Sequence, residues 1–170
     1  MSIIRIPDGN DLGTKKLKGV GHFKMYWHQQ GKHIACTFKS LEEIESMDSG
    51  ILILEVGEHE ASHLSTTSLG KTCSILSFSF EPQGSRFAVI YGRKQDVSIC
   101  IMDLNNISCD TTLPPLLGLQ VNSIHWSPTG GLIVLSGYDN FVLYDVNKME
   151  ILVQEHFTPM AVEWSRSGRQ

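Results

Sequence analysis

A four-fold internal repeat constrains the fold of this chain more than any other feature of its sequence. Each copy has an apolar run that reaches an aromatic residue, then three turn residues and a glycine. The glycines that end the copies are Gly31, Gly84, Gly130 and Gly168, at intervals of 53, 46 and 38 residues. A repeat of this kind indicates that each copy is one supersecondary unit, which stacks on its neighbours to bury a shared core.

An aromatic residue stands four positions before the glycine in every copy. These residues are Trp27, Phe80, Trp126 and Trp164. An apolar residue stands two positions earlier again, and side chains two positions apart lie on the same face of a strand. We therefore expect the aromatic residues to pack in the core between neighbouring sheets, in equivalent positions.

The turn between the aromatic residue and the glycine has the residue types that a tight bend requires. Pro82 and Pro128 stand two positions before Gly84 and Gly130. Proline presets a φ of about −65° at the second position of a turn, and glycine accepts a positive φ without a Cβ clash. A hairpin is therefore predicted in each copy.

Further apolar runs follow each glycine. Second strands are predicted around 34–36, 87–90 and 132–135, third strands at 51–56, 97–103 and 141–146, and weaker fourth strands around 61–64, 109–113 and 150–154. Four short strands in each copy, with no convincing helix, predict an all-β, WD40-like β-propeller. Propellers close with about four to eight blades. The sequence therefore predicts a partial propeller of about three four-stranded blades plus the first strand of another.

The repeat divides the chain into five parts. A lead-in, interpreted as carrying the last strand of a preceding blade, occupies residues 1–19. The three blades are predicted at 20–70, 71–119 and 120–158, and residues 159–170 begin the next one.

Composition and charge exclude several classes of protein. The 170 residues are 41% apolar and 19% charged, with a formal net charge of −4, which is typical of a globular domain and not of a disordered chain. No apolar run approaches the ~20 residues of a membrane helix, and the N-terminus lacks the pattern of a signal peptide. We therefore expect a cytoplasmic protein with no membrane partner.

The cysteines show no metal-binding or redox spacing. Cys36, Cys73, Cys100 and Cys109 form no C-x-x-C pair. In a chain without a secretory signal they are predicted to be reduced, with the first three buried in strands.

One short motif matches a catalytic pattern. The run 59–63, HEASH, fits H-E-x-x-H, in which two histidines on one helical face bind zinc and the glutamate activates a water molecule. A strand-like run and Gly57 precede it, so a blade edge is the favoured interpretation. We expect no catalytic residue, metal site or cofactor, and a zinc hydrolase built on His59, Glu60 and His63 is the alternative.

Two basic clusters are candidates for contacts with phosphate groups. They are Lys15, Lys16 and Lys18, and Arg93 with Lys94. Each such contact with nucleic acid adds salt-dependent affinity that does not depend on base sequence. Ordinary solvated loops are the alternative interpretation of both clusters.

The amino-acid sequences of the copies resemble those of one family. Residues 23–31, FKMYWHQQG, are similar to the start of a blade in the b subunit of eukaryotic translation initiation factor three. Residues 80–92, FEPQGSRFAVIYG, and 124–137, IHWSPTGGLIVLSG, resemble the next two blades. With the run 162–169, VEWSRSGR, the resemblance extends over residues 15–170.

This resemblance implies a non-enzymatic scaffold in translation initiation. In that family the propeller docks on the small ribosomal subunit, where it contacts protein and rRNA. The propeller also lies next to other subunits of the factor. No cofactor and no small-molecule substrate are implied. The propeller of the related initiation factor two-A and a WD-type adaptor in another pathway remain the alternatives.

Overall fold

The computed structural model describes residues 2–4, 11–14, 20–40, 49–70, 73–93, 96–112 and 120–168. In these ranges the chain is all-β, with fourteen strands. No helix that could cross a membrane occurs in them. The chain divides into two compact units, residues 1–71 and 72–170.

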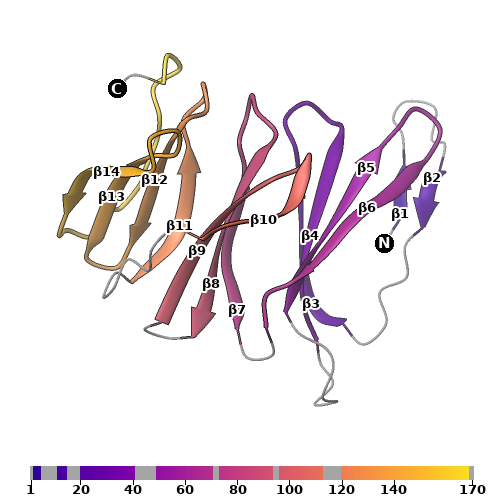
Figure 1. Ribbon diagram of the computed structural model, residues 1–170, viewed down its shortest axis with the longest axis horizontal. Coiled ribbons are helices and arrows are strands. Elements are labelled where there is room, and N and C mark those ends of the chain that lie inside the picture. The colour runs from indigo at the N-terminus through magenta and orange to yellow at the C-terminus, as the bar shows by residue number, and fades with distance from the viewer. Residues whose placement is uncertain are drawn as a thin grey trace. The chain divides into compact units, whose positions relative to one another are not determined.

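The first unit contains one four-stranded antiparallel sheet, whose strands follow their order in the chain (Figure 1). The strands are β3 (Val20–Trp27), β4 (His33–Ser40), β5 (Gly50–Val56) and β6 (Ala61–Ser68). Two short strands, β1 (Ser2–Ile4) and β2 (Asp11–Thr14), pair antiparallel before it. For residues 1–19 we expected one strand of a preceding blade, and the described part of this lead-in forms a two-stranded sheet instead. Its assignment to a preceding blade stays a prediction.

The core of the first unit lies on its two central strands. Ile34 and Cys36 of β4 pair with Leu54 and Leu52 of β5, and all four side chains are at most 3% exposed. Apolar side chains that alternate with them are buried as well, among them Ile53 at 1% exposure. Burial on both faces explains why these strands have continuous apolar runs in the sequence.

The second unit contains two four-stranded antiparallel sheets. One consists of β7 (Ser74–Phe80), β8 (Arg86–Arg93), β9 (Asp96–Asp103) and β10 (Asn106–Thr112), and the other of β11 (Val121–Trp126), β12 (Leu132–Gly137), β13 (Asn140–Asp145) and β14 (Glu150–Glu155). Strand β11 packs against β7 and β8. The two sheets of this unit therefore lie against each other.

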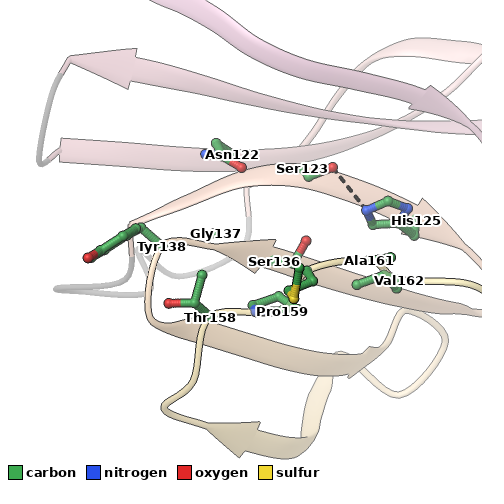
Figure 2. A pocket seen from close by; sticks show the side chains of 11 residues that line it. Asn122, Ser123, His125, Ser136, Gly137, Tyr138, Thr158, Pro159, Ala161 and Val162 are labelled. Carbon is green, nitrogen blue, oxygen red and sulfur yellow. Dashed lines mark hydrogen bonds between the residues drawn. The ribbon is translucent and has the colours of Figure 1, made fainter.

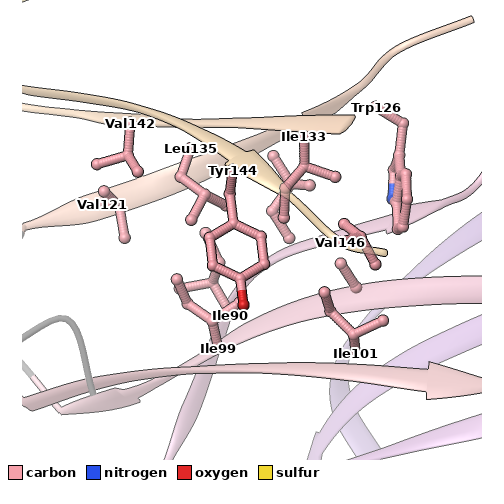
Figure 3. Close-up of a cluster of buried hydrophobic side chains, with 12 residues drawn as sticks. Ile90, Ile99, Ile101, Val121, Trp126, Ile133, Leu135, Val142, Tyr144 and Val146 are labelled. Atoms are coloured by element: carbon pink, nitrogen blue, oxygen red, sulfur yellow. The ribbon is translucent and has the colours of Figure 1, made fainter. Parts of the chain in front are cut away.

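An apolar layer fills the space between these two sheets (Figure 3). Its members are Ala88, Ile90, Ile99 and Ile101 from the first sheet, and Val121, Ile124, Trp126, Ile133, Leu135, Val142, Tyr144 and Val146 from the second. Complete burial of a large apolar side chain stabilises the fold by about 1.5–3 kcal/mol. This layer therefore holds the two sheets together strongly.

An aspartate ends the third strand of each sheet in the second unit. Asp103 Oδ1 accepts the N–H of Asn105 at 2.8 Å. Asp145 Oδ1 accepts the N–H groups of Asn147 and Lys148, each at 2.9 Å. A carboxylate that bonds the backbone two residues ahead stabilises a turn, so these acids fix the hairpins to β10 and β14.

The turn glycines differ in the reason for their presence. Gly31, Gly130 and Gly168 have positive φ values of 72°, 74° and 66°, as the turn pattern predicts. The expectation of a positive φ is wrong for Gly84. A Cβ atom at Gly84 would instead overlap the carboxylate of Glu81, so close approach of a side chain requires glycine there.

The fourth copy of the repeat forms its turn without a strand before it. Gly168 N–H donates to the carbonyl of Ser165 at 2.9 Å. Residues 159–165 belong to no sheet of the described chain. A strand is defined by the ladder that it forms with a neighbour, and none of the described strands pairs with this segment.

Cys36, Cys73 and Cys100 form no disulfide bond. Cys36 and Cys100 are buried in strands, as expected. Cys73 is only half-buried and precedes β7, so the prediction of a buried strand residue is wrong at this position. Its neighbours Ser74 and Ile75 are also only half-buried, which places it at the periphery of the sheet.

Candidate interaction surfaces

The residues of the H-E-x-x-H motif lie in a β-hairpin. His59 and Glu60 are in the turn between β5 and β6, where Gly57 N–H donates to the Glu60 carbonyl at 2.8 Å. His63 is in β6, and its Nε2 lies 2.9 Å from Thr66 Oγ1. Among the described residues, no three histidine, cysteine or acidic side chains are arranged to hold a metal ion. The helix that zinc hydrolysis requires is not formed by residues 49–70.

The candidate phosphate contacts fall mostly outside the described residues. Four of them, Lys15, Lys16, Lys18 and Lys94, are not among the described residues, and Arg93 is the last residue of β8. A role for these five residues in nucleic-acid binding therefore stays a prediction.

Two tryptophans of the repeat make the same hydrogen bond. The indole N–H of Trp126 donates to the carbonyl of Ser79 at 3.0 Å, and that of Trp164 donates to the carbonyl of His125 at 3.0 Å. Ser79 and His125 each stand directly before the aromatic residue of their own copy. In the second unit, each indole is therefore tied to the inner strand of the copy before it.

Trp27 departs from the predicted core packing. Its side chain is 57% exposed, and Phe23 and Met25 on the same face of β3 are 51% and 50% exposed. The equivalent Trp126 is only 6% exposed because the sheet of the preceding copy covers it. Trp27 belongs to the first copy, and its exposure shows that the described residues leave this face of β3 uncovered.

A partly buried ion pair at the turn between β7 and β8 has no signal in the sequence analysis. Arg86 Nε donates to Glu81 Oε2 at 2.8 Å, and Arg86 Nη2 donates to Glu81 Oε1 at 2.5 Å. The other sheet completes the network, because Gly131 N–H donates to Glu81 Oε1 at 3.1 Å and Arg86 Nη1 donates to Asn147 Oδ1 at 2.9 Å. The guanidinium also lies 5.7 Å from the ring centroid of Trp126, within the range of a cation–π contact.

The surroundings of Glu81 keep its carboxylate ionised. Burial by itself would raise the pKa of Glu81, but the hydrogen bonds and charge of Arg86, with the N–H of Gly131, outweigh it and lower the pKa. A Cβ atom at Gly130 would lie 2.5 Å from Glu81 Oε1. The repeat glycine therefore leaves room for the carboxylate of the neighbouring sheet.

A pocket of about 390 Å³ lies between the last sheet and the segment that follows it (Figure 2). Ser123 Oγ lies 2.9 Å from His125 Nε2, and burial lowers the pKa of His125. The lining contains no carboxylate to orient the imidazole, as a hydrolytic triad requires. The pair therefore has the geometry of a local side-chain contact on β11.

Comparison with known proteins shows what the chain is similar to. The family model described as Eukaryotic translation initiation factor eIF2A matches residues 15–170. The chain is 31% identical to the B subunit of eukaryotic translation initiation factor 3 from Arabidopsis thaliana, over 89% of this chain and 22% of that protein. It is 26% identical to the protein of the same name from Aedes aegypti, over 99% of this chain and 26% of that protein.

One solved structure is also similar. It is described as the crystal structure of the eukaryotic initiation factor, with a TM-score of 0.48 and 14% identity over 90% of this chain and 48% of that chain. The chain spans about a quarter of the length of the curated relatives that it matches. The resemblance stated from the sequence is confirmed by these relatives and the family model. The all-β, partial WD40-like propeller is confirmed as the fold class.

Proposed function

The chain belongs to the eIF2A family of translation initiation factors, and we propose that it acts as a non-enzymatic scaffold that docks on the small ribosomal subunit in the cytoplasm. The observation that carries this proposal is the extent of the family match. It runs through residues 15–170 and so includes all three four-stranded sheets. What the chain shares with its relatives is therefore the sheets themselves.

The second unit has the stiffness that a scaffold needs. Its two sheets are joined by an apolar layer, by the indole bond from Trp126 to Ser79, and by the ion pair of Glu81 with Arg86. Hairpins held in this way keep a fixed position relative to each other. Loops carried on a rigid framework are the usual place for partner contacts.

The proposed partners are the small ribosomal subunit and other subunits of an initiation factor. The relatives are named as one subunit of factor 3, which supports membership of a larger assembly. Contacts with rRNA would come from Lys15, Lys16 and Lys18, and from Arg93 and Lys94, through salt-sensitive pairing with phosphates.

Co-sedimentation with purified small ribosomal subunits over a series of salt concentrations tests the proposal. We expect the chain to sediment with the subunits at low salt and to dissociate as salt rises. Replacing Lys15, Lys16 and Lys18 by glutamate should reduce the bound fraction. The matched control replaces three exposed lysines, Lys24, Lys32 and Lys39, by glutamate; it changes the net charge by the same amount and should leave binding unchanged.

Failure to sediment at low salt would contradict ribosomal docking and favour a WD-type adaptor in another pathway. Equal losses in the two lysine variants would show that net charge alone governs binding. In that case the named lysines would make no specific contact.

A further inference from the structure

The outer strand of the last sheet, β14, has an unpaired edge within the described part of the chain (Figure 1). All six of its residues are exposed. Three consecutive apolar side chains lie at its middle, with Ile151, Leu152 and Val153 exposed by 41%, 42% and 39%. An edge strand presents backbone N–H and C=O groups that can pair with another strand.

The corresponding fourth strand of the first sheet carries fewer exposed apolar residues than β14. The outer strand of the first sheet, β6, has the sequence ASHLSTTS. Leu64 is its one large apolar side chain, and it is 38% exposed. Polar residues protect an edge from pairing, and β14 lacks them at its middle.

The edge is held in position by its own sheet. Asp145 fixes the turn that enters β14 through its bonds to Asn147 and Lys148. At the other end, the ring of Phe157 stacks on that of Phe141, with centroids 5.3 Å apart. An incoming strand would therefore meet a preformed template, which reduces the entropy lost on binding.

The charged residues at the ends of β14 determine which kind of strand can pair with its free edge. Glu150 and Glu155 stand on either side of the apolar residues. In a second copy paired antiparallel so that residues 151–153 face each other, Glu150 would lie opposite Gln154 and Glu155 opposite Met149, so neither glutamate would face a residue of opposite charge. Opposite charges that face each other across a strand pair are stabilising. Lysine or arginine at those places would therefore favour the pairing.

We propose that β14 binds an extended segment of a partner protein as an added antiparallel strand, and that this segment is apolar in its middle and basic at its ends. Backbone hydrogen bonds to the edge would give affinity, and the two glutamates would select the charge of the partner. The inference goes beyond docking on the ribosome and does not depend on it. Peptide binding and ribosome sedimentation can therefore fail separately.

Fluorescence anisotropy with the full chain and two labelled peptides tests this inference. One peptide alternates valine and threonine with a lysine at each end, and the other has the same middle with a glutamate at each end. We expect the lysine peptide to bind about fivefold more tightly, from two favourable cross-strand charge pairs. Replacing both Glu150 and Glu155 by lysine should reverse the preference. Equal binding of the two peptides, or no reversal, would overturn the proposal.

A proline at the edge tests the strand pairing itself. Leu152 lies at a bulge, because Leu143 pairs with Val153 and Tyr144 pairs with Ile151, and edge-strand bulges tolerate proline. Leu152→Pro should weaken binding of the lysine peptide about tenfold through lost backbone bonds.

Leu64→Pro is the matched control for this variant. Leu64 occupies the corresponding bulge of β6, where Ile53 pairs with Ser65 and Leu54 pairs with His63, so it should leave peptide binding unchanged. Equal losses in the two proline variants would overturn the proposal. A dimer that Leu152→Pro abolishes would also overturn it, because a second copy would then occupy the edge.

Discussion

Arg86 holds the carboxylate of Glu81 with two hydrogen bonds, of 2.8 and 2.5 Å, at a place where Glu81 is only 4% exposed. A buried charge is stable only while it is paired and hydrogen-bonded. Gly131 and Asn147 complete the network from the neighbouring sheet. The network therefore links the β7–β8 turn to the β11–β12 and β13–β14 turns, which are far from it in the sequence.

Loss of the Arg86 guanidinium should lower the stability of the fold. Arg86→Met leaves Glu81 buried without its cation, and we expect the free energy of unfolding to fall by about 3 kcal/mol. Urea unfolding followed by fluorescence measures it. The control is Lys148→Met, because Lys148 makes only long contacts of 3.8 and 3.5 Å and its side chain is 66% exposed. That change should cost less than about 1 kcal/mol, and equal effects would contradict the account.

Acid should destabilise the chain through the same carboxylate. Since the pKa of Glu81 in the folded chain lies below its ordinary value of 4.5, the unfolded chain binds the proton more readily. The stability that Glu81 contributes is complete above pH 4.5 and is lost as the pH falls through the lowered pKa. Unfolding by urea at a series of acidic pH values should show this fall, and Glu81→Gln should flatten it. An unchanged slope in the variant would contradict the assignment.

The hydroxyl of Tyr144 has no hydrogen-bond partner among the described residues. The side chain is 3% exposed, and Figure 3 shows the hydroxyl pointing toward Ile90 and Ile99. Because an unpaired hydroxyl is costly in an apolar layer, Tyr144→Phe should raise the free energy of unfolding by about 1 kcal/mol. Tyr138→Phe, at a side chain that is 73% exposed, should change nothing. A loss of stability in Tyr144→Phe would reveal a partner for the hydroxyl.

Mild acid should destabilise the first unit through protonation of His33. Burial, and then the charge of His28, lowers the pKa of His33 below its ordinary value of 6.5. The folded chain therefore resists protonation, and stability should fall as the pH drops below 6.5. Thermal unfolding of His33→Gln across pH 5 to 8 should show a smaller fall than the parent. The exposed His156 serves as the control, and His156→Gln should follow the parent curve.

The strands and turns could be predicted from the sequence because their signals are local. The run 87–90 lies within β8, and the run 132–135 lies within β12. Both follow a turn whose proline and glycine are close together in the sequence, so no distant residue has to be known. Gly84 shows the limit of this reasoning, because the Glu81 carboxylate that excludes a Cβ atom there is held in place by Arg86 and Gly131, and the turn pattern carries no signal for that.

Burial and the network between sheets could not be predicted in the same way. Trp27 and Trp126 hold the same position in the repeat, yet one is 57% exposed and the other 6%. Periodicity gives the face of a strand but not whether another sheet covers it. The partners of Glu81 and Arg86 in the next sheet lie 50 and 61 residues away, and a single sequence holds no local signal for such pairs.

Hydrogen exchange of the indole N–H groups, measured by NMR, tests most directly whether the aromatic residues of the repeat lie between stacked sheets. Single Trp→Phe variants assign the three signals. The account predicts slow exchange for Trp126 and Trp164, whose N–H groups bond to strand carbonyls, and fast exchange for the exposed Trp27. Exchange of Trp126 as rapid as that of Trp27 would contradict it.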